Sequence, residues 1–222
     1  MGKLYKRARA KINLGLNVVA KREDGFHDIE TIFYPIELSD ILHFNRSENF
    51  VFSSDMPELT PTPEDNLIVR AVKKLEEYSG KRINVHIHLE KKIPTGAGLG
   101  GGSSDAASTL LTLNELLQLK LPFESLAEIA LTLGSDVPYF LKPLPALGEG
   151  RGEILTPFPL SLNGYYLLLV NPGIHVNTGW AYSLIKPGYK DNSITGLKFN
   201  NQSLSFEYIR NFLSNDFEGP GA

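Results

Sequence analysis

Apolar and polar residues alternate along several stretches of the chain, which is the two-residue period of a strand with one buried face. Residues 12–18 alternate in this way and the turn residues 23–25 follow, so we predict a strand that opens a hairpin. Residues 29–44 are rich in large apolar side chains and predict a second strand and part of a third. We expect an interruption near Pro35 or at Ser39-Asp40.

Helical spacing of apolar residues begins after Asp65 or Asn66, either of which can cap a helix that stops at Ser79-Gly80. Residues 83–89 alternate again, so a strand leads directly into a glycine-rich stretch. Residues 165–170 form a continuous apolar run and predict a buried strand. Further helices are predicted at residues 106–117, 124–133, 178–185 and 203–213, and a loop at 54–65.

Composition narrows the class of protein. With 222 residues, 42% of them hydrophobic, the chain can form one or two domains. The net charge of -3 gives no general attraction to nucleic acid or to an anionic membrane, so any anionic ligand must be held locally. No cysteine is present and no apolar leader follows Met1, which predicts a cytoplasmic protein without disulfides. The longest apolar run is much too short to span a membrane.

The strongest chemical signal is the sequence PTGAGLGGGSS at residues 94–104, which lies between a predicted strand and a predicted helix. Five glycines let the backbone approach a ligand, and the following helix adds free N–H groups and the positive end of its dipole. A phosphate group fits such a surface without a basic side chain. The residues expected to bind nucleotide here are Pro94, Gly96, Gly98, Leu99, Gly100, Gly101, Gly102, Ser103 and Ser104.

Other phosphate loops match less well. Gly96, Gly98 and Gly101 satisfy G-x-G-x-x-G, but a glycine run this dense produces that pattern by accident. The acidic residue that a dinucleotide fold needs about 20 positions later would be Glu115, inside a helical pattern. No lysine follows the glycines as in a Walker A loop, and protein-kinase signatures such as D-F-G are absent.

The stretch PTGAGLGGGSSDAAS resembles the central ATP-binding motif of the GHMP kinases, the family of galactokinase, homoserine kinase, mevalonate kinase and phosphomevalonate kinase. Other segments are similar to the members that act on 4-diphosphocytidyl-2-C-methyl-D-erythritol in non-mevalonate isoprenoid synthesis. These segments are AKINLGLNV (10–18), DGFHDIETIF (24–33), DNLIVRA (65–71), LGSDVPYFL (133–141) and GEGRGE (148–153).

The resemblance implies an α+β fold of two domains with the active site between them. We expect an N-terminal ATP-binding domain at residues 1–155 and a partial C-terminal domain at 156–222. The implied reaction is phosphorylation of the C2 hydroxyl of the cytidylyl-methylerythritol substrate by ATP. Magnesium is expected with ATP; no spacing in the sequence fixes its ligands, but the Ser104 hydroxyl is a candidate and Asp105 a weaker one.

The resemblance also assigns roles to single residues. Asp136 is implied as the catalytic base, and Lys11 as the cation beside it that holds the substrate hydroxyl or the γ-phosphate. Without the resemblance, Asp136 would be interpreted as a cap or turn residue and Lys11 as a solvated strand lysine. The implied substrate contacts are Asn13, Phe26 and His27, with Phe26 and His27 assigned to the cytosine, and the implied adenine contacts are Asn66, Leu67 and Ile68.

Chains of this family usually continue past Asn215-Asp216-Phe217-Glu218 to a third glycine-rich motif, whereas residues 219–222 follow here. We therefore expect exposed apolar surface, poor stability or self-association. Three alternatives remain open at this stage. They are a homoserine-type or mevalonate-type kinase, a nucleotide-binding remnant without turnover, and a dinucleotide-dependent oxidoreductase.

Overall fold

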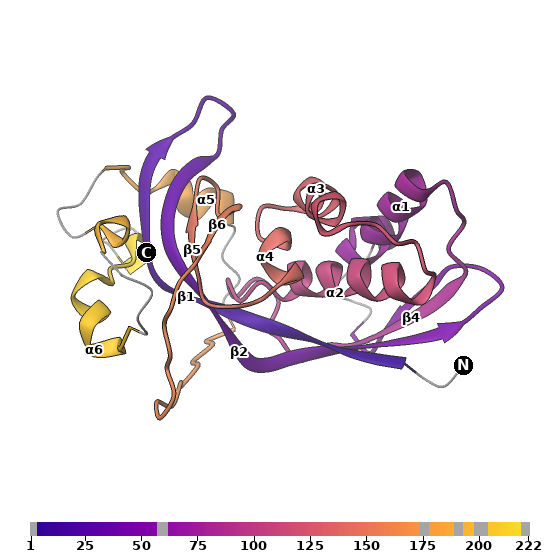
Figure 1. The fold of residues 1–222 in the computed structure, drawn as a ribbon. Coiled ribbons are helices and arrows are strands. Elements are labelled where there is room, and N and C mark those ends of the chain that lie inside the picture. The colour runs from indigo at the N-terminus through magenta and orange to yellow at the C-terminus, as the bar shows by residue number, and fades with distance from the viewer. Residues whose placement is uncertain (1–3, 57–61, 174–177, 189–192, 198–203, 219–222) are drawn as a thin grey trace. The chain divides into compact units, whose positions relative to one another are not determined.

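A computed structural model describes residues 4–56, 62–173, 178–188, 193–197 and 204–218 (Figure 1). Its backbone contacts group the chain into two compact units. Unit 1 comprises Met1–Lys11 and Ile36–Pro143, and unit 2 comprises Ile12–Pro35 and Leu144–Ala222. Each unit therefore takes two separate stretches of sequence. The domain boundary expected after residue 155 stays a prediction.

The elements mix strands and helices, as expected for an α+β fold. The strands are β1 (Leu4–Lys21), β2 (His27–Arg46), β3 (Val51–Ser54), β4 (Val85–Glu90), β5 (Ala146–Glu149) and β6 (Ile154–Pro157). The α-helices are α1 (Leu67–Ser79), α2 (Gly101–Leu116), α3 (Phe123–Leu133), α4 (Val137–Leu141), α5 (Thr178–Ser183) and α6 (Phe206–Ile209). Short 3₁₀ turns are η2 (Pro63–Asp65), η3 (Ile194–Gly196), η4 (Arg210–Phe212) and η5 (Asp216–Glu218).

The predicted hairpin is present, with β1 and β2 paired. In its turn the Arg22 N–H donates to the Phe26 carbonyl at 2.9 Å, and Gly25 adopts a φ of 85°. The predicted interruption of the second strand was wrong, because β2 is continuous through Pro35. Pro35 lies between the β2 residues that pair with β5 (31–33) and those that pair with β4 (41–46). A proline there removes no hydrogen bond to either of these strands.

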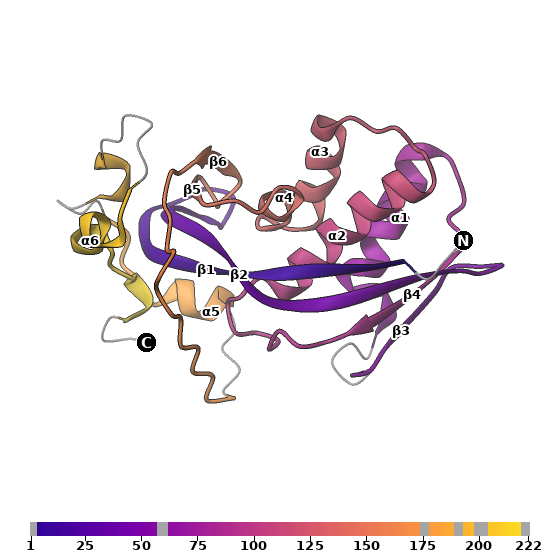
Figure 2. The same cartoon turned by 60° about the horizontal axis from the view of Figure 1, so that its bottom comes forward.

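In unit 1, β4 pairs antiparallel with residues 41–46 of β2 and parallel with β3. The predicted alternation of β4 is confirmed, since its residues are in turn buried and half-buried. Helices α1, α2 and α3 lie on one side of β4, as both views show (Figures 1 and 2). Helix α2 packs against α1, α3 and α4. It begins at Gly101, five residues before the predicted start, so the end of the glycine run is itself helical.

Helix α1 confirms its sequence signals. The Asn66 side chain accepts a hydrogen bond from the Ile68 N–H at 2.8 Å and so caps the first turn. At the other end Gly80 takes a φ of 65°, a left-handed conformation that favours glycine. The two caps define where α1 begins and ends. Its start lies beside the glycine-rich loop, because Asn66 and Leu67 line the same cavity as the glycines.

In unit 2, residues 31–33 of β2 pair antiparallel with β5, which pairs antiparallel with β6. Neither β5 nor β6 was predicted, because each has only four residues and no clear alternation. A core of buried apolar side chains lies in this unit. It consists of Ile32, Leu147, Phe158, Leu160, Ile194, Leu197 and Ile209.

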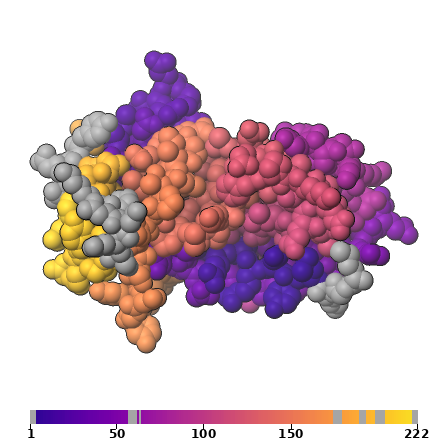
Figure 3. Space-filling view, viewed as in Figure 1, coloured from indigo at the N-terminus to yellow at the C-terminus, as the bar shows by residue number. Residues whose placement is uncertain are grey.

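The prediction of a buried strand at residues 165–170 was wrong. These residues belong to no strand, and the side chains of Tyr166, Leu168 and Val170 are 102%, 86% and 80% exposed. One orange lobe projects at the bottom of the space-filling view, while the remaining orange surface belongs to the body of the molecule (Figure 3). An apolar run is buried only if another element covers it, and the described residues supply no such cover. The expectation of exposed apolar surface is confirmed.

The last part of unit 2 is helical in short pieces. Helix α5 confirms the prediction at 178–185, although it is two residues shorter. The helix predicted at 203–213 is divided into α6 and η4, and residue 203 lies outside the described residues. The carboxylate of Asp216 accepts the Val18 N–H at 2.7 Å, so the end of the chain is held against β1. Among the described residues, no helix is long and apolar enough to cross a membrane.

Candidate functional site

The glycine-rich loop of unit 1 has the backbone that its sequence predicts. Gly96, Gly98 and Gly100 adopt φ values of 71°, 71° and 70°, which side-chain-bearing residues rarely take. A Cβ atom on Gly100 would lie 2.5 Å from the ring of Phe140, whereas one on Gly98 would meet nothing within 4 Å. Gly100 therefore permits close packing within the protein, and Gly98 leaves open space in front of the backbone.

The loop lines one side of a cavity of about 430 Å³. The opposite lining comes from the end of β3, the start of α1 and the end of β4, and it includes the apolar side chains of Met56, Leu67 and Leu89. An apolar slot joined to a glycine cradle suits a ligand with a flat apolar end and an anionic end. A nucleotide has this composition.

The N-terminus of α2 completes the anion-binding end. Its N-cap is Gly100, and no side chain caps the first turn, so the free N–H groups at this end are available to a ligand. The helix has 16 residues, long enough for its dipole to favour negative charge here. The residues present therefore fit the phosphate groups of a nucleotide.

Lys11 and Asp136 lie close together in unit 1. The Lys11 Nζ is 3.6 Å from Asp136 Oδ2, and the two side chains are 6% and 34% exposed. The Lys11 N–H also donates to the Leu99 carbonyl at 3.0 Å, and its Cγ is 3.3 Å from the position that a Cβ on Gly100 would take. The structure thus brings the predicted base, the predicted cation and the glycine-rich loop into contact.

The local geometry bears on the ordinary interpretations of these two residues: Asp136 does lie in a turn, and Lys11 is not solvated. Asp136 is the residue before α4, but its side chain makes no capping hydrogen bond to that helix. Lys11 is buried, not solvated. A half-exposed carboxylate that caps nothing and a buried ammonium beside it are the arrangement expected of a site, and burial of Lys11 is tolerable because of its carboxylate partner.

Not every predicted nucleotide residue reaches the cavity. Asn66 does, and it is also a helix cap, so both interpretations of this residue hold. Ile68 is 1% exposed and belongs to the core, and Ser104 is 2% exposed. Neither of these two is part of the cavity lining. The other predicted residues from Pro94 to Ser103 do line it, and their contact with nucleotide stays a prediction.

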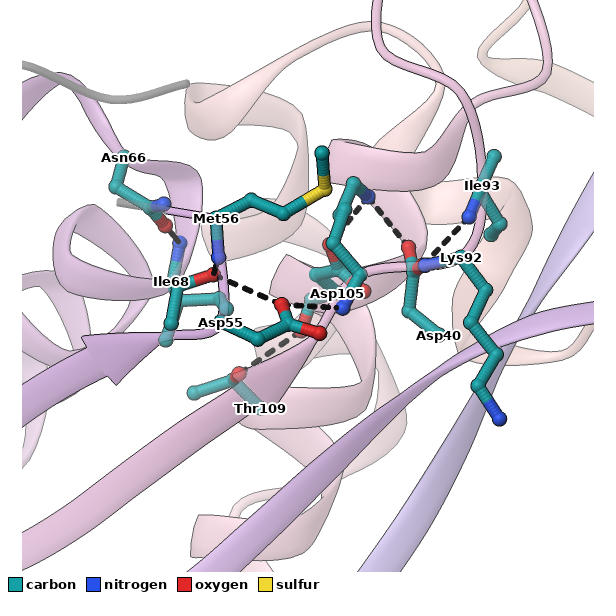
Figure 4. A network of polar contacts seen from close by, with 11 residues as sticks. Asp40, Asp55, Met56, Asn66, Ile68, Lys92, Ile93, Asp105 and Thr109 are labelled. Atoms are coloured by element: carbon teal, nitrogen blue, oxygen red, sulfur yellow. Dashed lines mark hydrogen bonds and ion pairs between the residues drawn. The ribbon is translucent and has the colours of Figure 1, made fainter. Parts of the chain in front are cut away.

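Below the loop lies a buried charged cluster that the sequence did not reveal. The Lys91 Nζ lies against Asp40 Oδ2 and 3.0 Å from Asp105 Oδ2 (Figure 4). Burial raises the pKa of the Asp105 carboxyl to about 7, although Lys91 counteracts this shift. The pKa of Lys91 is also raised: burial acts against the charge, and the two carboxylates outweigh it. The three residues are up to 65 positions apart in sequence, so no local motif joins them.

Unit 2 holds the predicted substrate residues. The ring of Phe26 is 49% exposed, and the Arg151 guanidinium lies 4.5 Å from its centroid. The His27 ring stacks on Tyr182 with centroids 5.2 Å apart and planes 16° from parallel. Tyr182 lies on α5, 155 positions from His27, and Arg151 belongs to the GEGRGE segment, so no local sequence signal connects either residue with the Phe26-His27 pair.

Asn13 is held by its neighbours in unit 2. Its Nδ2 donates to the Thr31 hydroxyl at 2.8 Å, and that hydroxyl donates to the Gly15 carbonyl at 2.6 Å. The network fixes the amide orientation, because an amide nitrogen can only donate. Its Oδ1 end is thereby defined as an acceptor. The substrate contact of Asn13 stays a prediction.

The described part of the chain has no cluster of side chains that would bind a metal ion by themselves. No group of three or more His, Cys, Asp or Glu side chains there could hold a metal. Magnesium commonly binds through phosphate oxygens and water with only one or two protein ligands.

Comparison with known proteins agrees with this geometry. Residues 66–142 match the model of the GHMP kinases N terminal domain. These residues contain the cap of α1, the glycine-rich loop and Asp136, so the fold and site define a GHMP kinase. Homoserine kinase from Cytophaga hutchinsonii has the same fold, with a TM-score of 0.59 at 16% identity over 86% of this chain and 62% of that chain.

Proteins with higher sequence identity show which family of GHMP kinases the chain belongs to. A relative from Bacteroides fragilis, 4-diphosphocytidyl-2-C-methyl-D-erythritol kinase, is 48% identical over 189 residues, which are 83% of this chain and 69% of the relative. A crystal structure of 4-(cytidine 5'-diphospho)-2C-methyl-D-erythritol kinase aligns with a TM-score of 0.74 at 35% identity over 98% of this chain and 77% of that chain. The chain belongs to the 4-diphosphocytidyl-2-C-methyl-D-erythritol kinase family. The accidental G-x-G-x-x-G match therefore does not indicate an oxidoreductase.

Proposed function

We propose that this protein transfers a phosphoryl group from ATP to the C2 hydroxyl of 4-diphosphocytidyl-2-C-methyl-D-erythritol, a step of non-mevalonate isoprenoid synthesis. The observation that carries the proposal is the contact of Lys11 with both Asp136 and the glycine-rich loop. Identity of 48% to a kinase of that name supports the choice of substrate. ATP supplies the phosphoryl group, and magnesium would lower the negative charge on its phosphates.

The chain's own residues would bind and position the reactants. The loop amides and the start of α2 hold the phosphates, and the apolar wall with Leu67 and Leu89 receives the adenine. Asp136 accepts the proton of the attacking hydroxyl, while Lys11 offers positive charge to the oxygens of the transferred group. Phosphoryl transfer needs little beyond such positioning and charge stabilisation, and no further catalytic group is required.

Unit 2 would recognise the cytidine end. Phe26 presents a half-exposed aromatic face, and the His27 ring is fixed by its stack on Tyr182. Aromatic rings stack on nucleobases, and a histidine nitrogen can hydrogen-bond to a base edge. The phenylalanine supplies stacking only, because its ring carries no hydroxyl.

The test is ADP release from Mg-ATP with the cytidylyl-methylerythritol substrate, mevalonate and homoserine offered in turn. Release is expected with the cytidylyl compound alone. Asp136→Asn keeps the size of the side chain but cannot accept the proton, so we expect its kcat to fall at least about 100-fold. ADP release with mevalonate or homoserine instead would contradict the choice of substrate. Full activity of Asp136→Asn would contradict the role of the base.

A further inference from the structure

The charged cluster below the loop reaches both ends of the glycine-rich segment. At the start of the segment, Asp40 Oδ1 accepts the N–H groups of Lys92 at 2.6 Å and of Ile93 at 2.8 Å (Figure 4). At its end, Asp105 in the second turn of α2 bonds to Lys91 Nζ at 3.0 Å. Since Lys91 also contacts Asp40, one connected set of side chains joins the residues before and after the loop.

The packing around Lys91 is tight as well as polar. A Cβ atom added to Gly101 would lie 2.8 Å from Lys91 Nζ and 3.0 Å from the Ile93 side chain. The first residue of α2 therefore rests directly on the ammonium group. The backbone N–H of Lys91 is held in addition by Asp55, whose Oδ1 accepts it at 2.9 Å. The ammonium group has little room to move unless the loop moves with it.

Such a cluster is a poor device for stability alone. The side chains of Asp40, Lys91 and Asp105 are 0%, 10% and 4% exposed, so two carboxylates share one ammonium away from water. Asp105 Oδ1 is buried and has no hydrogen-bond partner among the described residues. Buried ionic groups commonly stabilise less than apolar residues of similar volume. The presence of these three charged side chains in the interior therefore calls for a reason other than stability.

We propose that Lys91, Asp40 and Asp105 are positioning residues that clamp the first turns of α2 to β2 and to the end of β4, and so hold the glycine-rich loop in the form that receives phosphate. The inference rests on the proposed ATP site. Lys91 and Asp105 belong to the cavity lining, whereas Asp40 does not. The effect of all three passes through the backbone of residues 92–101, whose N–H groups must converge on the phosphates before binding.

The test separates positioning from simple structural support. Asp105→Ala removes the link between α2 and Lys91 but leaves the Lys91–Asp40 pair intact, so the protein should still fold. It also removes a carboxyl that is costly to bury, so its unfolding temperature at pH 8 should be unchanged or higher. The dissociation constant of the ATP analogue AMP-PNP, measured by calorimetry, should nevertheless rise about tenfold. A merely structural role would instead lower the unfolding temperature while it raised the dissociation constant.

Two further variants complete the experiment. Asp105→Asn keeps an oxygen that can accept from Lys91, so its AMP-PNP affinity should stay within about threefold of the wild type. Lys92→Met is the matched control, since Lys92 is the exposed neighbour of Lys91, and it should bind as the wild type does. Unchanged affinity of Asp105→Ala, or equal loss in Asp105→Asn, overturns the clamp alone. No binding by the wild type overturns the proposed ATP site together with the clamp.

Discussion

At the scale of single residues, the pKa of Asp105 makes a prediction about stability. The carboxyl titrates near 7 in the folded protein and near its ordinary value of 3.8 in the unfolded chain. Between these values the folded state binds more protons, so this group's contribution to stability is complete below about pH 4 and is lost as the pH rises through 7. Above that range the folded protein bears the full cost of the buried charge.

Asp105→Asn removes this titration. The gain in unfolding free energy of the variant over the wild type should therefore grow between pH 4 and pH 7 and stay constant above, with an upper limit of about 4 kcal/mol. Urea unfolding at several pH values measures it. Asp40, Asp55 and Lys91 lie around Asp105 and are present in both proteins. Their own contributions to the pH dependence of the unfolding free energy therefore largely cancel in the comparison. A difference that is flat across this pH range would show that Asp105 is ionised throughout.

At the scale of elements, Gly100 determines how the loop meets α2 and α4. Gly100→Ala combines a φ of 70° with a Cβ 2.5 Å from the buried Phe140 ring, so we expect a loss of about 3 kcal/mol in unfolding free energy. Gly98→Ala shares the backbone strain but has open space, and it should cost about 1 to 2 kcal/mol. Chemical denaturation of both variants gives the difference that belongs to packing. Equal losses would show that Phe140 moves aside.

The sequence predicted those elements whose signals are local. The cap at Asn66, the left-handed Gly80 and the alternation of β4 each depend on neighbouring residues, and all three are present. Lys11 and Asp136 were paired only through the family resemblance, because 125 positions separate them. The Lys91 cluster and the His27–Tyr182 stack were missed for the same reason: tertiary contacts leave no periodicity in the sequence.

The failure at residues 165–170 has a different physical origin. The apolar run was correctly recognised. Apolar side chains are more stable when buried, but the sequence of the run does not show whether another part of the protein covers it. Along the run, Tyr166 and Leu168 are far more exposed than their alternate neighbours Tyr165 and Leu169, which are 51% and 41% exposed. The less exposed side rests on unit 2, where Tyr165 lies 5.4 Å from the Phe206 ring. The other side remains open.

At the scale of the whole molecule, this open side predicts self-association of the 222-residue chain. Three large apolar side chains in alternation present a surface that water solvates poorly, and an extended segment outside any strand has backbone groups available for pairing. Sedimentation velocity over a concentration series should therefore show the mean mass rising with concentration. The expected range is tens of micromolar, on the order of −6 kcal/mol for a small apolar contact.

Tyr166→Ser combined with Leu168→Gln and Val170→Thr should remove the concentration dependence, because it replaces only the exposed side of the segment. The matched control is Tyr5→Ser, which alters a single exposed aromatic residue, 62% exposed, on β1 of unit 1 and should leave association unchanged. The triple variant should keep the AMP-PNP affinity of the wild type, since the nucleotide cavity is lined by unit 1 residues only. A wild-type chain that stays monomeric at 100 micromolar, which is about ten times the lower end of the expected range, would show that the exposed run is tolerated in water.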